Sequence, residues 1–190
     1  RRFRTETCFA LLFMTFVVII LVIPQAVLSF SDSSPGGNWY VHYMLAAPFA
    51  AILNMLGIEA SAFAEIVSIT FNDGTTHSIE ISTACAGLYS FSIFVSAFFS
   101  FVLVFERLPL KVMALVLSLG LLVAYLGNLF RMVVVGVVGY YYGMEALLWA
   151  HDNVGWIVFL AWSSVFWYAV VGYADRRTRW PVLVKRGATA

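Results

Sequence analysis

The chain has 190 residues, of which 62% are hydrophobic and 11% are charged, and its formal net charge at pH 7 is +1. A soluble domain is about half apolar and about a quarter charged, so this composition excludes an ordinary soluble domain. The near-neutral charge argues against a nucleic-acid partner. Together with a mean hydropathy of +0.91, these values predict a polytopic membrane protein.

The positions of Lys and Arg predict the topology. They occur in "RRFR" at residues 1–4, in the 106–111 loop, at Arg131 and in the C-terminal run, and none lies between Thr5 and Phe105. Basic residues mark cytoplasmic loops. We therefore expect a multi-pass protein of the plasma membrane whose two ends and 106–111 loop are cytoplasmic.

Four apolar segments are long enough to span a bilayer. We expect these spanning helices at residues 8–30, 85–105, 111–130 and 153–173, followed by a cytoplasmic tail at 174–190. Segment 39–57 carries His42, Pro48 and Asn54, and can be a span, a re-entrant helix or an interfacial helix. The sequence thus predicts one all-α membrane domain over residues 1–190, a helical bundle of four to six membrane segments.

The segment 131–151 is apolar but interrupted by Gly136, Gly139 and Gly143. We expect it to leave and re-enter the same face as a re-entrant or interfacial helical pair, or to be a further span. With segment 39–57 it is a candidate gate for a substrate that enters from the bilayer. On this interpretation, leucine at Gly139 and Gly143 blocks processing without unfolding the protein.

Residues 58–83 differ in kind from the spans. The stretch "IVSITFNDGTTHSIEIS" alternates apolar and polar residues, and "NDG" at its centre is a hairpin turn signal. Open strand edges are not tolerated in lipid. We therefore expect a small extracytoplasmic β-hairpin.

Three chemically capable residues fall at one predicted depth. Cys85, Arg131 and His151 each lie about 30 to 36 Å along a helix from a cytoplasmic charged loop, at 1.5 Å per residue. The hydrocarbon core is about 30 Å thick. The three residues, from different helices, are thus expected together at the extracytoplasmic face.

Cysteine, cation and histidine together suit acyl transfer through a thioester. The helix that Cys85 begins favours its thiolate form, and Arg131 nearby does the same. His151 can take or give a proton near neutral pH. Asp152 and Asn128 are close enough in sequence to orient the imidazole.

Each residue also has a simpler interpretation. A single cysteine in an apolar protein is usually a packing residue, Arg131 alone suits a headgroup anchor, and His151 alone suits an interfacial histidine. Two other functions stay open: a haem-binding electron carrier using His42 and His151, and an assembly subunit in which Cys85→Ala is silent. With no CxxC and no metal-ligand cluster in the sequence, we expect neither metal nor cofactor.

Three motifs resemble a known family. "TACAGLYS" with Cys85, "GNLFRMVVVG" with Asn128 and Arg131, and "HDNVGWIVF" with His151 and Gly155 resemble, in order and spacing, the A-C-[AS]-G-[LI], N-x-x-R and His-containing motifs of the exosortase and archaeosortase family. The resemblance covers residues 60 to 175, and the short chain favours the archaeosortase branch.

The resemblance implies a membrane cysteine transpeptidase. Family members act on surface proteins whose C-terminal sorting signal combines a recognition motif, a transmembrane helix and a basic tail. By the motif match, Cys85 is the nucleophile, Arg131 the oxyanion or carboxylate partner, and His151 the acid and base. The acceptor that resolves the thioester is implied to be a lipid headgroup.

Overall fold

The computed structural model describes residues 2–31, 39–81, 87–104 and 109–187. Most of these residues are helical, and three short strands form one sheet. The elements in chain order are α1 (Arg2–Ser31), α2 (Trp39–Val41), the π-helix η1 (His42–Ala46), α3 (Ala47–Met55), β1 (Ala60–Phe63), β2 (Ile66–Thr70), β3 (Thr76–Glu80), α4 (Leu88–Val104), α5 (Leu110–Tyr142) and α6 (Met144–Gly187).

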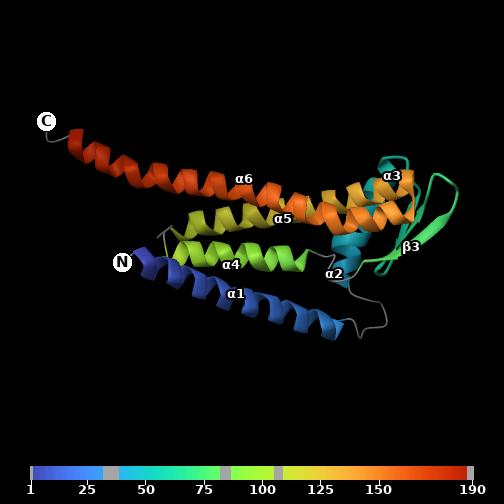
Figure 1. The fold of residues 1–190 in the computed structure, drawn as a ribbon, viewed down its shortest axis with the longest axis horizontal. Coiled ribbons are helices and arrows are strands. Elements are labelled where there is room, and N and C mark those ends of the chain that lie inside the picture. The colour runs from blue at the N-terminus through green and yellow to red at the C-terminus, as the bar shows by residue number, and fades with distance from the viewer. Residues whose placement is uncertain (1, 32–38, 82–86, 105–108, 188–190) are drawn as a thin grey trace.

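The molecule has two parts (Figure 1). The first, here called the stem, consists of α1, α4, residues 110–128 of α5 and residues 155–172 of α6. The second, here called the head, consists of residues 39–81 with residues 129–154 of α5 and α6. The chain ends of α1 and α6 lie at the stem end opposite the head (Figure 1).

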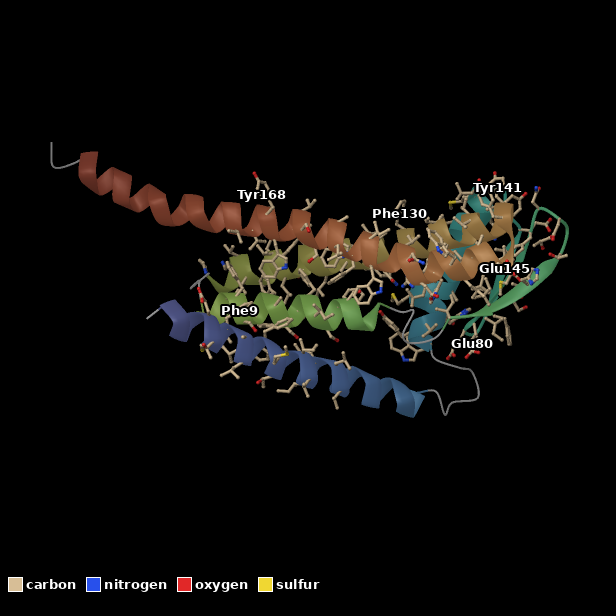
Figure 2. The ribbon with its side chains drawn as sticks, in the orientation of Figure 1. Phe9, Glu80, Phe130, Tyr141, Glu145 and Tyr168 are labelled. Carbon is tan, nitrogen blue, oxygen red and sulfur yellow. The ribbon has the colours of Figure 1, made fainter. Side chains whose placement is uncertain are left out.

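Two helices that run through the stem into the head have the length and apolarity to cross a membrane, Leu110–Tyr142 and Met144–Gly172. Two further apolar helical stretches, Glu6–Val22 and Ser90–Val104, are shorter. Large apolar side chains are exposed along the stem, and Phe130 and Tyr168 project away from it in Figure 2. An apolar surface of this extent suits contact with lipid. Two clear candidates for membrane-spanning helices are thus present, and a total of four to six membrane segments stays a prediction.

Helix α4 lies between α1 and α6 in the stem. The Ser92 hydroxyl donates a hydrogen bond to the Ile20 carbonyl of α1 at 3.4 Å. Across the bundle, the Phe94 ring lies 4.7 Å from that of Phe166 and 5.2 Å from that of Trp162, both on α6. The small Ser92 allows α4 to pack closely against α1, and the ring of Phe94 fills the space toward α6.

The head contains the predicted hairpin. Strands β2 and β3 pair antiparallel with Ile69 opposite His77, and the turn closes with a hydrogen bond from Gly74 N to Phe71 O at 2.9 Å. A third strand, β1, pairs with β2 through Ala60 opposite Ile69. The sequence pattern did not predict β1, so the sheet is larger by one strand, in the order β1-β2-β3.

Segment 39–57 forms the helical side of the head core. Residues of η1 and α3 pack against the sheet and against the last turns of α5 and the first of α6. The Tyr125 hydroxyl donates to the Met44 carbonyl at 3.0 Å, which ties η1 to α5. The fully or almost fully buried members include Leu45, Leu53, Val67, Ile69, Leu147 and Ala150.

Segment 131–151 is the end of α5 and the start of α6, reversed at Gly143. Gly143 has φ +86° and ψ −178°, a conformation essentially confined to glycine. At Gly139 an added Cβ would lie 2.5 Å from a methyl carbon of Leu147. The packing at Gly139 and the backbone conformation at Gly143 therefore argue against the expectation that leucine at both glycines leaves the fold intact.

Candidate functional site

Arg131 of α5 and His151 of α6 meet where the stem joins the head. The Arg131 Nη2 donates a hydrogen bond to the main-chain carbonyl of His151 at 3.3 Å. The Arg131 Nε is buried and has no hydrogen-bond partner among the described residues. A buried N–H without a partner is costly. Arg131 as a whole also lines a cavity, where its charge suits a carbonyl oxygen, an oxyanion or a carboxylate.

Gly155 makes room for this guanidinium. It lies one helical turn after His151, and an added Cβ would lie 2.9 Å from Arg131 Nε and 3.2 Å from its Cζ. The guanidinium therefore packs directly on the backbone of α6. This contact gives a physical reason for the glycine in "HDNVG".

Asn128 lies one helical turn before Arg131, on the same face of α5. Its side chain packs against Gly87, where an added Cβ would lie 3.0 Å from the amide carbon. Gly87 also has φ +75°, in the region that favours glycine. Asn128 thus holds the chain directly before α4 close to α5.

His151 and its neighbour Asp152 interact more weakly. The His151 Nδ1 lies 3.3 Å from Asp152 Oδ1, and the two side chains are 40% and 79% exposed. An ion pair this exposed contributes little. Asp152 therefore biases the orientation of the imidazole and does not fix it.

A cavity of about 390 Å³ lies on the stem side of Arg131 and His151. The motif residues Gly87, Asn128, Arg131, His151 and Gly155 all line it. Its walls are aromatic, formed by Phe91, Trp156, Phe159 and Trp162. No sequence motif indicated these four residues, although Trp156, Phe159 and Trp162 recur at the three-residue spacing of one helix face.

Cys85 lies outside the described residues. In the sequence it precedes Gly87 by two positions, and Gly87 lines the cavity. The structure thus brings together four of the five predicted site residues, Arg131, His151, Asn128 and Asp152, around one cavity.

His42, the second histidine of the haem interpretation, lies elsewhere in the head. Its Nδ1 is 2.8 Å from the Ala64 carbonyl in the β1–β2 turn, and His42 does not line the cavity that His151 lines. Nothing in this arrangement favours a haem held between the two residues.

Residues 2–168 match the family model of the transmembrane exosortases. The match extends over most of the chain, and the protein belongs to this family of membrane transpeptidases that process sorting signals. No curated protein and no solved structure matches the chain.

Proposed function

We propose that the chain is a cysteine transpeptidase with protease chemistry, acting at the extracytoplasmic face of the plasma membrane. It cleaves the C-terminal sorting signal of surface proteins through a thioester at Cys85. It then transfers the acyl group to a membrane acceptor, a lipid headgroup. The observation that supports this most strongly is the Arg131–His151 contact in a cavity that Gly87 also lines.

In the first step the Cys85 sulfur attacks the carbonyl carbon of the substrate peptide. A C–S bond forms, the C–N bond breaks, and His151 delivers the proton that the departing amine requires. Two residues of chain span about 7 Å at most, so the position of Gly87 keeps Cys85 within reach of the cavity.

Arg131 stabilises the negative charge that develops on the carbonyl oxygen. Arg131 lines the cavity, and its guanidinium can donate a charge-assisted hydrogen bond to an oxyanion there. A preorganised donor at this place is worth about 10²- to 10³-fold in rate. The Nη2 contact with His151 holds the guanidinium in position for this role.

In the second step the acceptor resolves the thioester. Its amine or hydroxyl attacks the thioester carbon, a C–N or C–O bond forms, and the C–S bond breaks to return the Cys85 thiolate. His151 takes the acceptor's proton. In the tautomer whose Nδ1–H donates to Asp152, Nε2 carries the lone pair for this transfer.

The test is co-expression with surface proteins from the same genome that end in a membrane helix and a basic tail. We expect a truncated product and a hydroxylamine-sensitive adduct on Cys85. Both are lost in Cys85→Ala, whereas Cys8→Ser, at an exposed position on α1, retains them. Normal processing by Cys85→Ala would overturn the proposal.

A further inference from the structure

A second cavity, of about 220 Å³, lies on the head side of Arg131 and His151. Both residues line it as well as the first cavity. The pair therefore separates two spaces, one among the stem helices and one beneath the sheet. None of the chemistry described above uses the second space.

The walls of the second cavity are apolar. Phe49 of α3, the end of β3, and residues of α5 and α6 enclose it, and the principal lining side chains are Phe49, Ile79, Ile81, Met132, Val135 and Leu147. A cavity for a drug-sized ligand has a volume of about 300 to 1,000 Å³. This one is smaller, so its size suits a single side chain.

Arg131 and His151 form the wall that the two cavities share. If these residues act on the carbonyl that Cys85 attacks, as proposed above, the reacting carbonyl lies at this shared wall. The membrane helix of a sorting signal follows its recognition motif, so it leaves through the stem side and the motif lies on the head side.

We propose that the second cavity is a specificity pocket for one apolar side chain on the acyl side of the reacting bond. This inference rests on the proposed function and adds to it the class of residue that the enzyme selects. Most of its wall is aliphatic or aromatic. A large aliphatic or aromatic side chain is therefore favoured over a small one.

The probe is a panel of short peptides that end in a thiol-reactive fluoromethyl ketone. The two residues before the ketone are varied in turn among Gly, Ala, Leu and Phe. Protein in lipid nanodiscs is treated with each peptide, and modification of Cys85 is followed by mass spectrometry. At one of the two positions we expect Leu or Phe to react at least about tenfold faster than Gly.

Val135→Phe fills the pocket, and Val123→Phe is the matched control. Both residues are on α5, but Val123 is exposed and lines neither cavity. We expect Val135→Phe to abolish the preference for Leu and Phe while Gly and Ala peptides still react, and Val123→Phe to keep the wild-type profile. A Val135→Phe variant that also loses Gly reactivity is replaced by Met132→Ala, which must shift the preference toward larger side chains.

Two failures can be told apart. If no peptide modifies Cys85 faster than a small thiol reagent does, the proposed function itself is contradicted. Peptide-dependent labelling of Cys85 that shows no side-chain preference, or a preference unchanged in Val135→Phe and Met132→Ala, would overturn only the pocket. It would assign the space to another occupant, such as a lipid acyl chain.

Discussion

At the scale of single residues, the site depends on the half-buried Arg131 side chain and on Gly155, against which it packs. A Cβ at residue 155 would lie 2.9 Å from Nε, so the guanidinium would have to shift from the position in which it contacts His151. The three family motifs are thus coupled by packing as well as by chemistry. Asn128 and Gly87 are coupled in the same way.

The first prediction concerns Gly155→Ala. The added methyl group displaces the guanidinium, so we expect Cys85 acylation to slow by about tenfold or more while the thermal unfolding temperature changes little. Gly172→Ala is the matched control, because it lies on the same helix with no atom within 4 Å of an added Cβ. Equal acylation rates in the two variants would show that the Arg131–Gly155 contact is not needed.

The second prediction separates His151 from Asp152. The Asp152 side chain is 79% exposed and 3.3 Å from the imidazole, so Asp152→Asn is expected to slow processing by less than about fivefold. His151→Ala removes the proton-transfer group and is expected to cost about 10²-fold or more. Processing of a sorting-signal protein in cells measures both. If Asp152→Asn slowed processing as much as His151→Ala, the Asp152 carboxylate would do more than orient the imidazole.

At the scale of elements, the chain reversal between α5 and α6 brings Arg131 of α5 next to His151 of α6. Gly143 adopts a conformation that costs other residues about 1 to 3 kcal/mol. We expect Gly143→Ala to lower the free energy of unfolding by that amount, and Gly172→Ala not to. Denaturation in detergent measures the difference. Equal stability of both variants would mean that the reversal tolerates a side chain.

The hairpin turn makes a pH-dependent contribution. Side-chain and backbone hydrogen bonds from Thr75 lower the pKa of Asp73 below its usual 3.8. The folded turn thus favours the carboxylate, and its stabilisation is present above about pH 4 and lost as the pH falls through the lowered pKa. We expect Asp73→Asn to unfold at a lower temperature than wild type at pH 6, with a smaller difference near pH 3. A difference that does not depend on pH would contradict this role.

The elements differ in how far the sequence predicts them. The hairpin follows from alternation around Asn72–Asp73–Gly74, and these strands are present. Strand β1, Ala60–Phe63, is four residues of small and aromatic side chains, and its pairing with β2 depends on tertiary contacts that no local pattern carries. The close packing at Gly139 could not be predicted, because its neighbour Leu147 lies across the turn on the next helix.

At the scale of the whole molecule, a lipid-facing stem carries a packed head, and the site lies where they join. Helix spacing from the charged loops that we predict to be cytoplasmic was enough to predict that Arg131 and His151 share one level, and they are in contact. The second cavity could not be predicted, since α3, the sheet, α5 and α6 all contribute to it. Such a space depends on how the head closes over the stem.

The central claim is that Cys85 acts with Arg131 at the extracytoplasmic face. The most direct test is the rate at which a membrane-impermeant maleimide modifies Cys85 in intact cells, in a Cys8→Ser background with and without Arg131→Ala. We predict rapid labelling from outside, slowed by about tenfold in Arg131→Ala because the thiolate loses its cationic neighbour. Labelling only after permeabilisation, or at a rate indifferent to Arg131, would contradict this account.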